Sequence, residues 1–210
     1  MSLGFDTLGP YLAACVVLTV APGPDNILVV SLGLSRGRRP AVLAAWGMVS
    51  GVLVHTVAAA LGISAVLSAS EVAFKVVQYA GAAYLAYLAW RIIRERGGTA
   101  IGSADQAPEG AWALFRRGFL MNVLNPKVAL FFLAFLPQFV RRDIGMPVWL
   151  QMVILGLLFM AQAFVIFTTF GLFAGLLGDL IARRPWIQRV FDWLTAGVFA
   201  ALALTLAFGF

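Results

Sequence analysis

Two charged side chains of opposite sign, Asp25 and Lys127, lie inside long hydrophobic stretches of the sequence. A charge at the centre of a lipid bilayer costs at least about 2.5–3.5 kcal/mol, so it must be paired, hydrated or used. A buried carboxylate can bind a proton or an ammonium group, and a buried ammonium group can bind a carboxylate. The two residues therefore predict a site for a proton or a small charged solute, in which they pair or nearly pair in one state.

A proline motif precedes each charge. Residues 21–26 read Ala-Pro-Gly-Pro-Asp-Asn, and residues 122–127 read Asn-Val-Leu-Asn-Pro-Lys. Proline removes a backbone donor and clashes with the preceding turn, so each hydrophobic helix should bend or unwind there and free carbonyl groups. Ordinary proline kinks are the alternative, but they leave the two charges unexplained. The predicted substrate- or proton-binding site consists of Asp25, Lys127, Asn26, Asn125, Asn122, Pro22, Gly23, Pro24 and Pro126.

Four further residues could line the same cavity, and each has a simpler structural role as its alternative. Gly51 precedes His55 by four residues, so both can face one neighbouring helix, and the glycine would allow close packing. His55 can equally serve as a structural hydrogen-bond partner. Tyr84 can instead belong to aromatic packing, and Gln162 can be a polar position in the wall of the fifth hydrophobic segment.

An enzyme is the first function class that the sequence disfavours. Ser50 and His55 are five residues apart, which separates them by about 140° around a helix, so they cannot form a catalytic dyad. The single cysteine, Cys15, excludes an intramolecular disulfide, a CxxC pair and a thiolate metal cluster. The sequence also contains no P-loop or dinucleotide fingerprint. We therefore expect no enzymatic activity, metal or cofactor.

The elements that must position these residues are membrane-spanning helices. Hydrophobic residues make up 62% of the 210 residues and charged residues only 11%, which excludes an ordinary soluble domain. The apolar runs are near-continuous, as in helices, and do not alternate as in a barrel. Six segments are long enough to span a bilayer, at 8–34, 41–68, 72–92, 116–138, 147–178 and 187–208.

A polar stretch rich in glycine and serine, at 94–113, divides the six segments into two sets of three. We expect residues 1–93 and 114–210 to form two three-helix repeats of one membrane domain. The loops after the first, third and fifth segments hold eleven Lys and Arg residues, whereas those on the other side hold three. The positive-inside rule then places the linker in the cytoplasm and both termini outside. The net charge of +6 thus indicates topology and not nucleic-acid binding.

Asp25 and Lys127 should lie at one depth in the bilayer. Asp25 is 11 residues from Arg36, and Lys127 is 10 residues from Arg117. Both are therefore about 15 Å from the cytoplasmic flank of their helix, near the midplane. The first segment runs inward and the fourth runs outward, so the sequence predicts an all-α integral membrane fold of two inverted repeats with helices 1 and 4 broken. Many secondary transporters have this architecture.

The motifs and their order also resemble one family. They are Pro-Gly-Pro-Asp-Asn at 22–26, Ser-Arg-Gly-Arg-Arg at 35–39, the spacing of Gly47, Gly51 and His55, Ala-Gly-Ala-Ala-Tyr-Leu at 80–85, and Asn-Pro-Lys at 125–127. Together they resemble the LysE/RhtB-type amino-acid exporters. The resemblance implies six helices in a bacterial inner (plasma) membrane, and efflux of an amino acid or close derivative by antiport with protons.

Other functions fit the same residues. An exporter of another small solute or ion is one alternative, and a non-transporting membrane scaffold or accessory subunit is another. The identity of the exported amino acid is not readable from the motifs. A homodimer could form through small-residue faces such as that of Gly171 and Gly175. The first ten residues contain no Lys or Arg, so we expect the first helix to be retained and not cleaved as a signal peptide.

Overall fold

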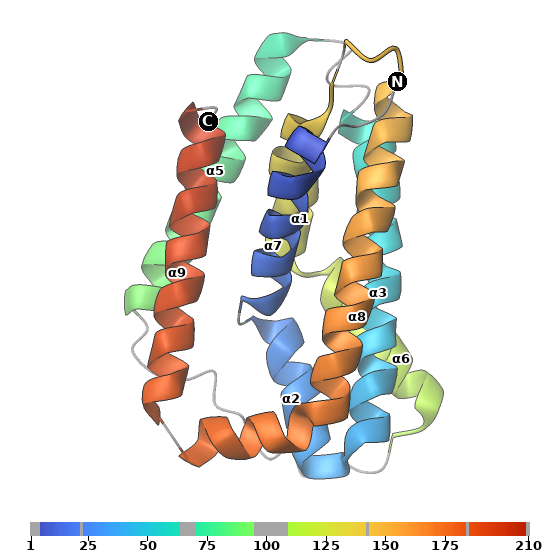
Figure 1. Cartoon of the computed structure of the whole chain (residues 1–210), viewed down its shortest axis with the longest axis vertical. Helices are drawn as coiled ribbons and strands as arrows, with labels where there is room; N and C mark the ends of the chain where they lie inside the picture. Colours follow the sequence, from blue (N-terminus) through green and yellow to red (C-terminus); the bar gives the residue numbers. More distant parts are fainter. Residues whose placement is uncertain are drawn as a thin grey trace.

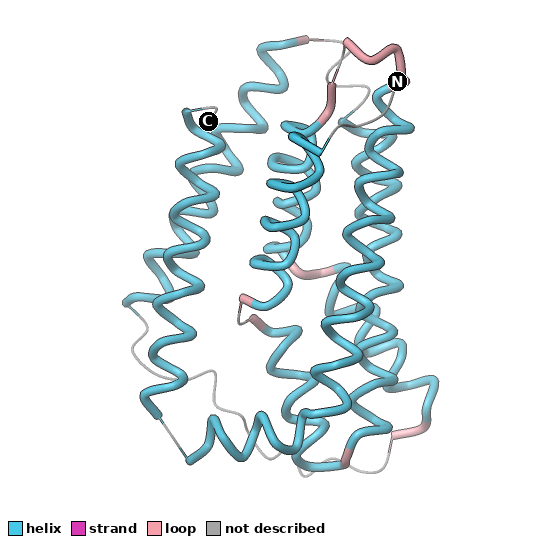
Figure 2. The backbone as a smooth tube through the Cα atoms, viewed as in Figure 1, coloured by secondary structure: helices cyan, strands magenta, loops and turns pink. Residues whose placement is uncertain are grey.

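The computed structural model describes residues 5–21, 23–63, 70–94, 109–141, 143–183 and 185–208. Within these ranges every element of regular structure is a helix (Figure 2), which confirms the predicted all-α class. In chain order the elements are α1 (Phe5–Val20), α2 (Pro24–Arg36), α3 (Arg38–Ala58), η1 (Ala59–Ile63), α5 (Glu71–Arg94), α6 (Ala111–Val123), α7 (Pro126–Leu130), η2 (Phe131–Phe135), η3 (Leu136–Phe139), α8 (Val148–Arg183) and α9 (Pro185–Phe208).

Two hydrophobic segments are each divided into two helices at their proline motif. The helices Leu8–Val20 and Asp25–Arg36 meet at 49°, and the helices Ala111–Val123 and Pro126–Phe139 meet at 47°. In each case a proline stands in the first turn of the second helix, where its missing N–H has no partner to lose. The interruptions therefore lie where the proline motifs predict them.

Membrane spans can be assigned to the described residues from length and composition. Arg38–Gly62 and Val148–Ala174 are each long and apolar enough to cross a bilayer. Each of the two bent pairs also qualifies when its helices are taken together, which brings the number of spans to as many as four. Six spans remain a prediction from the sequence. Most of the expected linker lies outside the described residues, and α6 begins within its expected range, at Ala111.

The helices form two unequal groups (Figure 1). In one group α3 packs against both α6 and α8, and α2 packs against α3 and α8. In the other group α5 lies beside α9, where the Gln78 side chain donates a hydrogen bond to the Leu206 carbonyl at 2.5 Å. α1 and α7 lie between the groups in this view, and Asp25 and Asn125 beside the two breaks are buried. The start of α1 and the end of α9 lie at the same end of the molecule.

Glycines allow the first group to pack backbone against backbone. A Cβ atom on Gly47 of α3 would lie only 1.9 Å from the carbonyl oxygen of Phe115 in α6. A Cβ atom on Gly118 of α6 would lie equally close to the carbonyl oxygen of Ala44. Gly171, which the sequence suggested for a dimer face, instead contacts Val42 within the same chain. α3 therefore covers Gly171 within the chain, and the homodimer itself stays a prediction.

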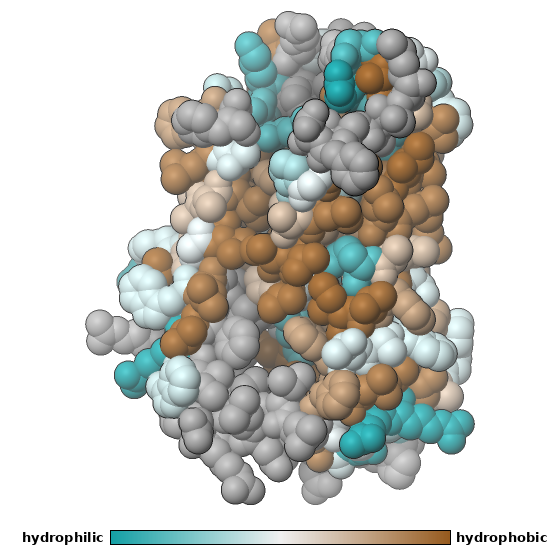
Figure 3. Space-filling model, viewed as in Figure 1, coloured by the Kyte–Doolittle hydropathy of each residue, from teal (hydrophilic) through white to brown (hydrophobic). Residues whose placement is uncertain are grey.

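Hydrophobic side chains fill the interior and also cover much of the outside. The buried core includes the adjacent rings of Tyr11, Phe131 and Phe159. On the visible face of Figure 3, hydrophobic residues gather across the middle around a small hydrophilic patch, and most of the other hydrophilic residues lie toward the two ends. Large apolar side chains such as Leu61 and Trp193 are exposed. An apolar band of this kind fits a lipid-facing surface.

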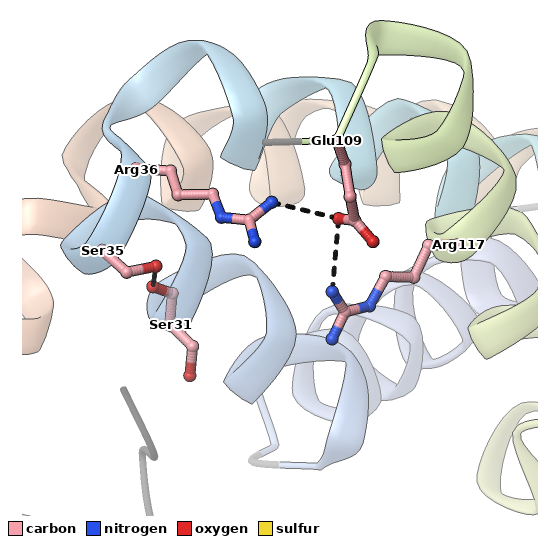
Figure 4. Close-up of polar contacts among 5 residues, drawn as sticks. All are labelled: Ser31, Ser35, Arg36, Glu109 and Arg117. Atoms are coloured by element: carbon pink, nitrogen blue, oxygen red, sulfur yellow. Dashed lines mark hydrogen bonds and ion pairs between the residues drawn. The ribbon is translucent and has the colours of Figure 1, made fainter. Parts of the chain in front are cut away.

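Two salt bridges that share one carboxylate join the end of α2 to the start of α6 (Figure 4). One carboxylate oxygen of Glu109 accepts from Arg36 at 3.2 Å and from Arg117 at 3.4 Å. Arg36 belongs to the first predicted repeat, whereas Glu109 and Arg117 flank the start of the second. The bridges are partly exposed, so each pair stabilises the fold by about 1 kcal/mol or less.

Candidate functional site

The two helix breaks contact each other through buried polar groups. The Asn125 side-chain amide, before α7, donates a hydrogen bond to the Asp25 carboxylate in α2. The Lys127 ammonium group, in α7, donates to the Ala21 carbonyl oxygen at the end of α1 at 3.0 Å. Asp25, Asn125 and Lys127 are only 1%, 2% and 5% exposed. Both charged residues that the sequence singled out therefore lie in one network, together with the predicted Asn125.

Asn125 holds two groups at once. Its side-chain oxygen accepts from the Lys127 backbone N–H at 3.0 Å, which makes it the N-cap of α7 as its type predicts. Its side-chain nitrogen then faces the Asp25 carboxylate. Because the cap fixes which end of the amide is oxygen, the orientation of the donor toward Asp25 follows from the local fold.

Asp25 and Lys127 have separate partners in this structure. No ion pair within 4.0 Å joins them among the described residues. The Lys127 ammonium group uses one of its three N–H donors on Ala21, so two donors remain for a ligand. Gly23 provides the space for this group, because a Cβ atom there would lie 3.0 Å from the Lys127 nitrogen.

Asn26 closes the end of α1. Its side-chain nitrogen donates to the carbonyl oxygens of Thr19, Val20 and Ala21 at 3.2, 3.0 and 3.1 Å. These carbonyls have lost their helical partners because the helix stops at the break. The side-chain oxygen of Asn26 is buried and has no hydrogen-bond donor in the described structure. Ala21 is shared, since its carbonyl oxygen accepts from both Asn26 and Lys127.

Next to the break between α6 and α7, Asn122 lies against two residues of α3, Gly51 and His55. The His55 ring nitrogen lies 3.0 Å from the Asn122 carbonyl oxygen, which also accepts from the Asn125 backbone N–H at 2.9 Å. The Asn122 side-chain oxygen would be 2.9 Å from a Cβ atom on Gly51. His55 is buried beside the Phe132 ring, a position that fits its structural alternative, and its role in a cavity stays a prediction.

The other two residues predicted to line the cavity, Gln162 and Tyr84, differ in whether they contact a helix break. Gln162 of α8 reaches the first break, because its side-chain nitrogen donates to the Thr19 hydroxyl at 2.9 Å. Tyr84 of α5 packs against the Tyr87 ring, and among the described contacts it makes no hydrogen bond to either break. Pro22 lies outside the described residues, whereas Pro24 and Pro126 begin α2 and α7.

Sequence reasoning missed Thr19 as a member of the site. Thr19 is buried, donates to the Cys15 carbonyl oxygen at 2.8 Å, and accepts from Gln162. A threonine bonded to the carbonyl four residues back is common in helices, so its type alone carries no signal. Its position one turn before a proline break was the available clue. Within the described chain, no cluster of three or more His, Cys, Asp or Glu residues could hold a metal ion.

The sequence of this chain is similar to those of known membrane proteins. A family model described as LysE type translocator matches residues 16–209. An uncharacterized membrane protein of Vibrio cholerae is 32% identical, over 94% of each chain. A homoserine/homoserine lactone efflux protein of Salmonella typhimurium is 29% identical over 95% of this chain and 88% of its own. A leucine efflux protein of Klebsiella pneumoniae is 31% identical over 65% of each. No solved structure matches the chain.

Proposed function

The chain belongs to the LysE type translocator family, and from this premise we propose that it is a secondary active exporter of amino acids or close derivatives. Proteins of this family are transporters and not enzymes. The observation that carries the proposal is the buried network in which Asn125 and Lys127 of one broken helix bond to Asp25 and Ala21 of the other. Burying such polar groups within a membrane costs free energy, so they are expected where they bind a substrate or a coupling ion.

The relatives narrow the class of cargo. Their names give homoserine, homoserine lactone and leucine as exported compounds. An amino group is common to all three, whereas the lactone has no free carboxylate and leucine has no hydroxyl. We therefore take an α-amino compound as the cargo of this chain, with Lys127 as the partner of its carboxylate where one is present. Asp25 then remains for the proton that drives export.

The proposed architecture is six helices in two inverted repeats in the inner membrane of a bacterium. The near-equal bends of 49° and 47° support equivalent breaks in the two halves. The start of α1 and the end of α9 lie at the same end of the molecule. This arrangement supports termini on one side of the membrane, which we take as the periplasm. Alternating access would then move the two halves about the breaks, as in other transporters built from inverted repeats.

Efflux from proteoliposomes tests the proposal. Vesicles loaded with labelled L-homoserine or L-leucine should lose label faster with the protein than without it, and faster still with an imposed pH gradient. The double variant Asp25→Asn, Lys127→Met should lose this efflux, whereas Lys75→Met, which removes an exposed lysine of α5, should keep it. Retained efflux in the double variant would overturn the assigned site. Wild-type protein that exports neither compound nor other amino acids would favour a non-transporting scaffold.

A further inference from the structure

We propose that two carboxamide oxygens beside the first break, Asn26 Oδ1 and Gln162 Oε1, bind the ammonium group of the exported amino acid. The inference rests on the proposed function and assigns one end of the cargo to named atoms. Asn26 follows Asp25 in α2, and Gln162 lies in the middle of α8, which packs against both α1 and α2. The two amides therefore approach the break from different helices.

The orientation of Gln162 is fixed by the hydroxyl of Thr19. That hydroxyl donates its only proton to the Cys15 carbonyl oxygen at 2.8 Å, so toward other groups it can only accept. Gln162 must therefore present its nitrogen to Thr19, and does so at 2.9 Å. The Gln162 oxygen consequently points away from Thr19.

The orientation of Asn26 is fixed in the same way. Three backbone carbonyl oxygens, those of Thr19, Val20 and Ala21, lie around its side-chain nitrogen at 3.2 Å or less. Carbonyl oxygens can only accept, so the opposite placement of the amide would put oxygen against oxygen. Both amides are thus bonded to Thr19, one to its carbonyl and one to its hydroxyl, with their own oxygens turned elsewhere.

Both of these oxygens lack a donor. Each is buried, and neither receives a hydrogen bond from any described residue. Asn26 as a whole is only 7% exposed. Buried acceptors without a donor from the protein are rare in folded proteins and are expected where a water, ion or ligand binds. Here two such acceptors belong to one connected group of residues.

An ammonium group suits the charge of this place. The carbonyl end of α1 carries the negative end of the helix dipole, which favours a cation. The two atoms without a partner are both acceptors, so a carboxylate, which also only accepts, could not bond to them. The Ala21 carbonyl that Asn26 contacts also holds Lys127, whose two remaining donors can take the other end of a zwitterion. The Asp25 carboxylate is engaged by Asn125 and is not needed for the ammonium group.

Binding measurements on the full-length protein in nanodiscs test the assignment. Displacement of labelled L-leucine by unlabelled L-leucine is compared with displacement by 4-methylpentanoate, which has the same skeleton without the amino group. L-homoserine and 4-hydroxybutanoate form a second pair. The wild-type protein should prefer the amino compound by at least about tenfold, because a charge-assisted hydrogen bond depends on it. Gln162→Met removes the oxygen at similar size and should lower this preference about tenfold.

Gln138→Met is the matched control. Gln138 also has an unpartnered buried amide atom, but that atom is the nitrogen, a donor. Its replacement should leave the preference unchanged. Should Gln162→Met fail to fold, Thr19→Val removes the hydroxyl that orients Gln162 and should lower the preference, and Thr19→Ser should restore it.

The outcomes separate this inference from the proposed function. Equal weakening of both competitors by Gln162→Met, or an unchanged preference, would overturn the ammonium site and leave only water or a packing role. A preference that depends on added Na⁺ and not on the amino group would also overturn it, in favour of an alkali cation. Wild-type protein that binds with the expected preference but exports nothing would overturn the proposed function and support the site. Wild-type protein that binds neither amino acid overturns both.

Discussion

The first break, between α1 and α2, and the second break, between α6 and α7, bend the chain alike but are closed by different groups. The second break supplies its own cap, because the Asn125 oxygen accepts from Lys127 within the same break. The first break has no such cap, since Gly23 precedes α2 without a side-chain bond. Its free carbonyls are closed by Asn26 from beyond the break and by Lys127 from the other half.

Because of this difference, the two halves present opposite kinds of hydrogen-bonding group. The first break presents carbonyl oxygens and a carboxylate, and is therefore a set of acceptors. The second break presents the Asn125 amide and the Lys127 ammonium group, and is therefore a set of donors. A solute with both a cationic and an anionic end would find complementary groups across the two. Two helices with the same bend thus acquire opposite polarity from a few side chains.

Removing the donor of the second break should have the largest effect. Lys127→Met should lower transport about 100-fold, because truncating one partner of a buried charged contact typically costs 2–5 kcal/mol. The melting temperature should also fall, since the change removes the donor of the buried Ala21 carbonyl and the only cation near the buried Asp25 carboxylate among the described residues. Efflux and thermal unfolding on one preparation check both. A variant that transports normally would show that the two sets of groups do not need each other.

Substitution of the glycines at close helix–helix contacts should have the next largest effect. Gly47→Ala would place a Cβ atom against the Phe115 backbone and should cost about 3 kcal/mol of stability. Gly33→Ala in α2 would clash at 1.9 Å with the Cβ atom of Ala174, a side-chain atom. Ala174→Gly should therefore rescue Gly33→Ala, whereas no side-chain change at Phe115 should rescue Gly47→Ala.

Unfolding in a denaturant series would measure these differences. Gly197→Ala is the control, because a Cβ atom there meets nothing within 4 Å. It should be neutral or slightly stabilising, as alanine favours a helix over glycine. Failure of the Gly33→Ala, Ala174→Gly pair to recover stability would contradict the packing of α2 on α8.

The two asparagine caps offer a direct comparison of the breaks. Asn125→Ala removes an N-cap and also the side-chain partner of Asp25, so it should destabilise the protein by about 2–3 kcal/mol. Asn26→Ala leaves the Ala21 carbonyl bonded to Lys127 and removes the donor of the Thr19 and Val20 carbonyls, and it should cost about 1 kcal/mol. Melting temperatures in nanodiscs would rank the two. The reverse order would mean that the first break depends on its own half and not on the other.

The smallest effect is expected far from both breaks, in the loop before α8. The Arg141 guanidinium donates to the exposed Asp143 carboxylate at 2.6 Å and holds its pKa below the usual 3.8. A lowered pKa contributes stability above pH 4 that is lost as the pH falls through the folded value. Because the pair is exposed, Arg141→Ala should leave the melting temperature unchanged at pH 7 within error. A clear drop would assign the loop a structural role.

Local features of the fold and site could be predicted from the sequence, and distant contacts could not. Proline acts on its own turn, so the breaks before Asp25 and Lys127 follow from residue types alone. The N-cap role of Asn125 follows in the same way. In contrast, the bond of Gln162 to Thr19 joins residues far apart in the chain, and nothing in either segment specifies the other. The pairing of α5 with α9 has the same origin, because it depends on which apolar faces fit.

The bond between Asn125 and Asp25 also has a consequence for how the protein is made. Asp25 enters the membrane with the first helices emerging from the ribosome, but its side-chain partner is synthesised 100 residues later. Until then the carboxylate lacks this donor in an apolar environment, which raises the free-energy cost of inserting the first helices. Chains that terminate before residue 125 would thus leave the Asp25 carboxylate without its side-chain hydrogen-bond donor.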